Sequence, residues 1–187
     1  MFRRTFNLIA IFGLVAGLSP VGFAHDSLRS GDALGAFRVT KIAGADEDGV
    51  SEGETLCYRC RYGSSPMVLA FVRSDSVDLK PTITALNELL SQHEDDRLRG
   101  LVAFYGDQAD ALRARAESLS SKVSDCAAPI VVTSDAAAGP ANYRLPEDHD
   151  VTIVTAIDSQ VVSVEHFDGS VDFDRVAASI KSAISES

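Results

Sequence analysis

Met67-Val68-Leu69-Ala70-Phe71-Val72 is the stretch that decides the fold, because six apolar residues follow one another without a polar interruption. A strand covered on both faces of a parallel sheet has this composition. The run is far shorter than the roughly 20 apolar residues of a membrane span. We therefore place residues 67–72 at the centre of a sheet in an α/β domain.

The segments around this run alternate between helical and strand patterns. Amphipathic helices are predicted over residues 78–90 and 109–123, and apolar strands over residues 101–105 and 130–133. Upstream, residues 37–42 alternate apolar and polar side chains, which favours a half-buried strand. Strands that alternate with helices imply right-handed crossovers between parallel neighbours.

The end of the chain changes from this alternation to a hairpin. Two β-branched runs, residues 151–157 and 160–167, are separated only by Asp158-Ser159, which is the spacing of a tight antiparallel turn. An amphipathic helix over residues 173–184 follows. The predicted fold is thus a central mixed sheet, with a parallel βαβαβ part, an antiparallel hairpin and a C-terminal helix.

The first 24 residues have the three zones of a secretory signal peptide. Arg3 and Arg4 form a charged start, residues 8–18 are apolar, and small residues precede His25. We expect export to the periplasm or the extracellular space and no transmembrane helix. The remaining chain divides into a flexible polar lead over residues 25–36 and one domain over residues 37–187.

The charge balance disfavours two classes of partner. The signal segment holds two of the 17 basic residues and none of the 27 acidic ones, so 15 bases face 27 acids in the rest. Nucleic acids and anionic membranes need a basic footprint, so both are disfavoured partners. The sequence also lacks a phosphate loop, a dinucleotide fingerprint and a Gly-x-Ser-x-Gly elbow. No cofactor is therefore expected.

Three cysteines carry the candidate chemistry. Cys57 and Cys60 form a CxxC motif, whereas Cys126 stands alone, so all three cannot pair internally. A CxxC pair closes a small ring, and the flanking Arg59 and Arg61 supply positive charge that favours a thiolate. In an oxidising compartment such a pair tends to become a disulfide.

The order of elements, together with Cys57-Tyr58-Arg59-Cys60 and the stretch leading into the hairpin (residues 143–167), resembles the thioredoxin-like superfamily. The resemblance is to its redoxin or peroxiredoxin branch and covers residues 37–184. It implies a thioredoxin-like fold, thiol chemistry and a protein thiol or disulfide as partner.

The chain departs from that family where the reactive cysteine normally lies. In the family, this cysteine follows the first buried parallel strand, but residues 73–78 read Arg-Ser-Asp-Ser-Val-Asp. The CxxC lies before the strand instead, near the opposite end of the sheet. The family's proline before the hairpin is also out of register, because Asp150 precedes Val151 and the nearest candidate is Pro146.

Topology predicts which groups meet at each end of the sheet. The three cysteines precede parallel strands, so they should emerge at one pole, which we call the cysteine pole, together with His93. His149 and His166 should lie near one another at the other pole. Residues 43–54, which are rich in glycine and acid, should form an exposed loop; their carboxylates suggest calcium, but EF-hand spacing is missing.

Three interpretations of the cysteine pole remain open on sequence alone. In the first, Cys57 attacks a partner and Cys60 resolves the product, with Arg59, Arg61 and Cys126 in support. In the second, the cysteines form a structural disulfide in a non-catalytic binding or scaffold module. In the third, a tetrahedral Cys₃His set holds zinc or copper(I). The ligands of that set would be Cys57, Cys60, Cys126 and His93.

Overall fold

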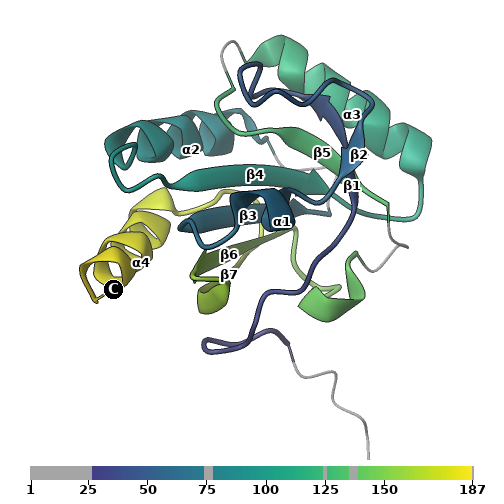
Figure 1. Cartoon of the computed structure of the whole chain (residues 1–187). Helices are drawn as coiled ribbons and strands as arrows, with labels where there is room; N and C mark the ends of the chain where they lie inside the picture. Colours follow the sequence, from purple (N-terminus) through teal and green to yellow (C-terminus); the bar gives the residue numbers. More distant parts are fainter. Residues whose placement is uncertain (1–26, 74–77, 124–125, 135–138, 187) are drawn as a thin grey trace, which may run out of the picture.

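Strand β3 (Met67–Val72) lies in the interior of one seven-stranded mixed sheet, next to its middle strand, as its composition predicts. It pairs parallel with β4 (Arg99–Phe104) and antiparallel with β6 (Val151–Ile157), and all six of its residues are buried. The strand order is β2-β1-β5-β4-β3-β6-β7 (Figure 1). The computed structural model describes residues 27–73, 78–123, 126–134 and 139–186. The predicted signal peptide lies outside these residues.

The remaining elements follow the predicted alternation. The other strands are β1 (Val39–Ala43), β2 (Thr55–Leu56), β5 (Ile130–Thr133) and β7 (Gln160–Phe167). The helices are α1 (Tyr58–Tyr62), α2 (Lys80–Gln92), α3 (Ala109–Lys122) and α4 (Phe173–Glu186), with a 3₁₀ turn at Ala141–Tyr143. The hairpin strands match the prediction at both ends, whereas the short elements β2 and α1 are additions.

Two apolar clusters cover the two faces of the sheet. The three long helices bury their apolar stripes against one face, through residues such as Ile83, Ala116 and Ile180. The other face is covered by shorter pieces of chain, among them α1, which contributes Tyr58, and the 3₁₀ turn, which contributes Tyr143. The fold therefore places the CxxC motif on the face that carries no long helix.

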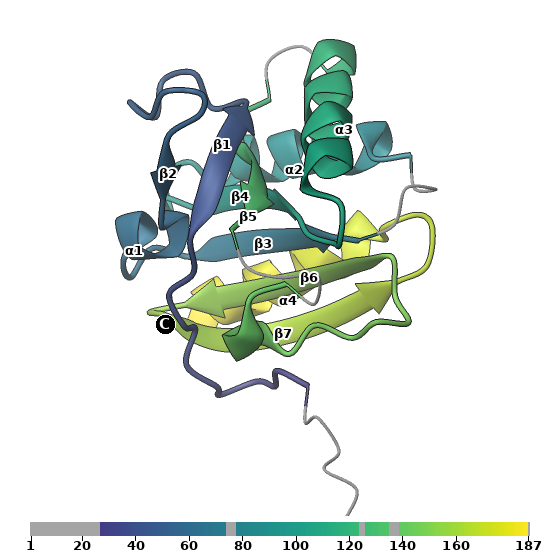
Figure 2. The ribbon, with the colours of Figure 1, turned by 90° about the vertical axis from the view of Figure 1, so that its right-hand side faces the viewer.

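The turn of the β6–β7 hairpin fixes the end of α1. Asp158 and Ser159 both have positive φ, the conformation of the tight turn that their spacing predicts. The amide of Asp158 donates to the carbonyl of Ser64, and the Ser159 hydroxyl donates to the carbonyl of Gly63, at 3.2 and 3.0 Å. Figure 2 shows the hairpin, with α4 behind it.

The expected flexible lead makes defined contacts in its described part. Leu28 and Leu34 are buried, Ala33 forms a β-bridge with Gln160, and the Gly31 amide donates to the Val161 carbonyl at 2.8 Å. The segment over residues 28–34 is thus packed along the hairpin in this structure. No helix within the described residues is long and apolar enough to cross a membrane.

Candidate active site

The two cysteines of the CxxC motif form a disulfide at the start of α1. Cys57 is the N-cap of this helix, and its Sγ accepts a hydrogen bond from the Cys60 amide at 3.1 Å. Cys57 is half-buried and Cys60 is exposed. The pair therefore lies where another protein can reach it.

Two tyrosines hold α1 against the rest of the domain. Tyr58 is 1% exposed, and its hydroxyl donates to Asp48 Oδ2 at 2.6 Å. The Tyr62 hydroxyl donates to the Gly100 carbonyl at the start of β4, also at 2.6 Å. The disulfide is consequently carried by a short helix that is tied to the β1–β2 loop at its start and to β4 at its end.

A buried lysine organises the loop between β1 and β2. Lys41 is 2% exposed, and its Nζ donates to Asp48 Oδ1 at 2.9 Å and to the carbonyls of Ala45 and Val50 at 3.0 and 2.9 Å. All three ammonium protons are thereby satisfied. The expectation of an exposed acidic loop is wrong at Asp48, because its side chain is only 19% exposed.

The pKa of Asp48 lies below its usual value. Burial alone would raise it, but hydrogen bonds from Tyr58, Lys41 and the Val50 amide, together with the charge of Lys41, outweigh burial. Burial and the neighbouring Asp48 raise the pKa of Tyr58, so this hydroxyl keeps its proton and acts as a donor. The carboxylate is therefore ionised, and both of its oxygens accept hydrogen bonds within the domain.

Arg59, inside the CxxC motif, and Arg61, directly after it, take different positions. Arg61 is exposed, and its guanidinium donates to the main-chain carbonyl of Asp48. Arg59 is half-buried, its Nε has no hydrogen-bond partner, and its charge lowers the pKa of Tyr143, which burial raises. Both positively charged residues nevertheless belong to α1, the helix that carries Cys60.

Cys126 is a free, buried cysteine just ahead of β5. Its thiol donates to the Ala128 carbonyl at 3.1 Å, and burial raises its pKa. Its own carbonyl accepts from the Ala45 amide at 2.7 Å, so it contacts the same loop that holds Asp48. A buried thiol with a raised pKa is a poor nucleophile.

The proposed metal ligands do not form a set in this structure. His93 ends α2, and its Nδ1 lies 2.9 Å from Asp96 Oδ2. Cys57 and Cys60 are joined to each other. Within the part of the chain that the structure describes, no group of three or more His, Cys, Asp or Glu side chains is arranged to hold a metal ion.

A cleft beside α1 was not foreseen from the sequence. It has a volume of about 550 Å³ and lies between Tyr62 of α1, the end of α2 and the start of β4. Leu90, Leu98 and Pro129 give it an apolar part, and Arg99 lies on its wall. Because these residues come from four separate segments, no local pattern could reveal the cleft.

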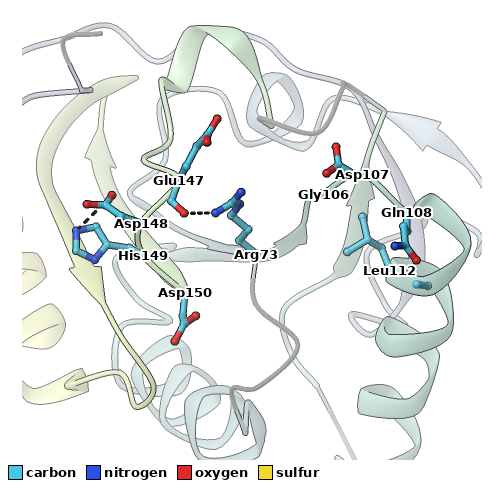
Figure 3. A pocket seen from close by; sticks show the side chains of 10 residues that line it. Arg73, Gly106, Asp107, Gln108, Leu112, Glu147, Asp148, His149 and Asp150 are labelled. Carbon is cyan, nitrogen blue, oxygen red and sulfur yellow. Dashed lines mark hydrogen bonds and ion pairs between the residues drawn. The ribbon is translucent and has the colours of Figure 1, made fainter. Parts of the chain in front are cut away.

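The opposite pole holds a second, polar cavity where the redoxin cysteine would normally lie. It measures about 410 Å³ and includes Arg73, Asp107 and His149 (Figure 3). The Arg73 guanidinium donates to the Glu147 carbonyl. None of the described residues that line this cavity is a cysteine, so the thiols and the usual family site lie at different ends of the sheet.

His149 and His166 lie together at this second pole, as topology predicts. Their rings stack at 4.9 Å between centroids with a 6° interplanar angle. His149 Nδ1 lies 3.1 Å from Asp168 Oδ1, and His166 Nδ1 lies 3.1 Å from Thr152 Oγ1. Parallel stacked rings do not direct their nitrogens at a common metal ion.

Comparison with known proteins supports the fold. No family model and no curated protein matches the chain. A chain from Chlorobium tepidum, described as a thiol:disulfide interchange protein DsbE, is similar at TM-score 0.64 and 12% identity, covering 84% of this chain and 99% of that one. AhpC of Mycobacterium tuberculosis is similar at TM-score 0.58 and 20% identity, covering 84% and 99%. The chain therefore has a thioredoxin-like fold.

A further solved structure extends this likeness. A yeast mitochondrial 1-Cys peroxiredoxin is similar at TM-score 0.55 and 13% identity, covering 83% of this chain and 76% of that one. The fold of this chain is thus similar to the folds of these redoxin-type proteins over more than four fifths of its length. At such low identity the likeness concerns the fold alone, and chemistry must be argued from the site.

Proposed function

We propose that this protein is a thiol-disulfide oxidoreductase that works through Cys57 and Cys60. The observation that carries the proposal is an accessible CxxC disulfide on a short helix, held in place by hydrogen bonds on either side. Its partner is a protein that carries a dithiol or a disulfide.

The exchange proceeds in two balanced steps. In the reduced protein, the Cys57 thiolate attacks one sulfur of a partner disulfide, and the other partner sulfur leaves as a thiolate and takes up a proton. The Cys60 thiolate then attacks Cys57 Sγ, which breaks the mixed disulfide and releases the second partner sulfur. Two electrons pass to the partner, and the pair returns to the oxidised form seen here. The reverse sequence oxidises a partner dithiol.

Cys57 is the attacking sulfur in this proposal for two reasons. The Cys60 amide already donates to Cys57 Sγ, and a hydrogen bond of this kind becomes stronger when the sulfur is charged. Arg59 and Arg61 add positive charge from the same helix, which also favours the thiolate. Cys60, which is more exposed, follows as the resolving sulfur.

A purely structural disulfide is the second candidate, since the usual family position has no cysteine. A loop of four residues gains less from a cross-link than a longer loop does, however: the chain-entropy relation gives about 2 kcal/mol, against about 3 kcal/mol for 15 residues. The helix is also held by Tyr58 and Tyr62 independently of the sulfurs. Stabilisation of the fold is therefore a weak explanation for the presence of the Cys57–Cys60 disulfide.

Turnover in a disulfide-reduction assay tests the proposal. The protein should reduce insulin disulfides with dithiothreitol as reductant, and Cys57→Ser and Cys60→Ser should each lower the rate at least tenfold. Cys126→Ser is the matched control, because its hydroxyl can still donate to Ala128 and its rate should stay within about twofold of the parent. An equal rate in all four proteins would refute the proposed function.

Export remains part of the proposal. The signal-like segment over residues 1–24 and a disulfide at Cys57–Cys60 both agree with an oxidising compartment. N-terminal sequencing of the protein isolated from its native cells should find His25 first. A chain that retains Arg3 and Arg4 in the cytoplasm would contradict this localisation.

A further inference from the structure

A chain of polar contacts runs from the sheet to the CxxC motif. It begins at Lys41 Nζ on β1, passes through both carboxylate oxygens of Asp48, and ends at the hydroxyl of Tyr58. Tyr58 follows Cys57 directly in the sequence. A buried charge pair is thus connected to the residue next to the proposed attacking sulfur.

Each member of this chain is hydrogen-bonded to its neighbour in the chain. Asp48 Oδ1 accepts from Lys41 and from the Val50 amide at 2.7 Å, while Oδ2 accepts from Tyr58. Arg61 and Tyr62 are the other titratable groups on α1 that act on Tyr58. Lys41 and Asp48 together carry no net charge. The electrostatic field at the cysteine sulfurs therefore comes mainly from Arg59 and Arg61.

Burying the Lys41–Asp48 ion pair costs desolvation free energy, so stability alone is a weak explanation for its presence. Burying an ion pair often stabilises a fold no better than apolar residues of similar size do. Charges in a poorly solvated interior act on their neighbours more strongly than charges in water. A thiolate forming next to Tyr58 would therefore respond to any change in the charge balance of this pair.

Resting on the proposed function, we propose that Lys41, Asp48 and Tyr58 are positioning residues that set the acidity of the Cys57 thiol and thereby the redox equilibrium of the Cys57–Cys60 pair. Lys41 balances the carboxylate, and Tyr58 both fixes α1 and shields that carboxylate with its hydroxyl.

Two substitutions should shift the equilibrium in opposite directions. Tyr58→Phe keeps the ring but exposes the Asp48 charge towards α1, so the Cys57 acid dissociation constant should fall about threefold. Asp48→Asn removes the negative charge while Lys41 keeps two carbonyl acceptors, so the constant should rise about threefold. A loss of structure alone would not produce opposite signs.

Tyr62→Phe is the matched control on the same helix. It removes an equally short hydrogen bond, but one to a neutral carbonyl rather than to a carboxylate. Thiolate absorbance at 240 nm is followed with pH in the full chain, as the difference between reduced and oxidised protein, so that Cys126 cancels. The equilibrium constant with glutathione is measured alongside and should move with the acidity.

The outcomes separate this inference from the proposed function. If the acid dissociation constant of Cys57 shifted equally in Tyr58→Phe and Tyr62→Phe, or did not shift in Tyr58→Phe, the role of the network would be overturned. This holds even if the parent protein turns over disulfides. Opposite shifts in Tyr58→Phe and Asp48→Asn would support the network, even if no turnover is found. Should Asp48→Asn not fold, the comparison of the two tyrosine variants decides the question.

Discussion

At the scale of single residues, Gly44 lies directly after β1 and packs closely against the segment that contains Cys126 and Ala128. Its φ is +75°, and a Cβ at this position would meet the Ala128 carbonyl oxygen at 2.5 Å and the Cβ of Cys126 at 3.4 Å. Both contacts are with backbone or short side chains that have little room to move. Glycine is required here on two independent grounds, backbone conformation and space.

Gly44→Ala should therefore destabilise the protein more than a matched glycine substitution does. Gly31 has a similar φ of +89° but nothing within 4 Å of its added Cβ, so Gly31→Ala measures the backbone strain alone. We expect about 1 kcal/mol for Gly31→Ala and about 2–4 kcal/mol for Gly44→Ala in urea unfolding. Equal losses would show that the loop can move away from Ala128.

At the level of residues, the sequence was sufficient to select the cysteines of the CxxC motif, but not the buried ion pair of Lys41 and Asp48. The CxxC spacing was sufficient to select Cys57 and Cys60. Lys41, in contrast, occupies a polar position in an alternating strand, a pattern that normally indicates solvent exposure. Its burial depends on Asp48 folding back from an irregular loop seven residues further on, and a pairing through a loop leaves no periodic signal.

At the scale of elements, the β6–β7 hairpin supports the CxxC helix through one side chain. The Ser159 hydroxyl donates to the Gly63 carbonyl, the residue that ends α1. Ser163 lies on the same hairpin, and its buried hydroxyl has no hydrogen-bond partner. Ser159 lies in the turn with a positive φ and binds α1, whereas Ser163 lies within β7 and does not.

Ser159→Ala should cost about 1 kcal/mol of unfolding free energy, because it leaves the Gly63 carbonyl without its partner. Ser163→Ala should be neutral or slightly stabilising, since no bond is lost there. Urea unfolding of both variants measures the difference. If Ser163→Ala proved the more harmful of the two, the hairpin would not anchor α1 through Ser159.

The histidine stack should make this hairpin sensitive to acid. Burial and the neighbouring His149 lower the pKa of His166 below its ordinary value of 6.5 in the folded protein. As pH falls from about 7, the unfolded chain takes up this proton first, so stability should decrease until the folded pKa is passed. The stability of His166→Asn should fall less over the same range, as followed by urea midpoints. Parallel pH profiles would remove His166 as the cause.

Periodicity predicted the long elements and failed on the short ones. The buried run at β3 and the helical stripes of α2, α3 and α4 each repeat often enough to be recognised. Helix α1 has five residues and β2 has two, which is too short for either period to show. These short elements carry and flank the CxxC, so the site was located by its residue types rather than by its structure.

At the scale of the whole molecule, the sheet carries its CxxC disulfide at the end opposite to the one where redoxins have their usual cysteine. The sequence order alone placed the CxxC ahead of β3, and the structure gives it a helix, a cleft and a buried charge pair. The pole after β3 keeps a polar cavity and the histidine stack instead.

The reduction potential of the Cys57–Cys60 pair, measured in glutathione redox buffers, tests the central claim most directly. Known oxidoreductases lie between about −120 and −270 mV, and the exchange mechanism predicts a value in that range. Structural disulfides typically lie below about −300 mV. A value of that kind, with a bridge that glutathione leaves intact, would contradict thiol-disulfide exchange at this site.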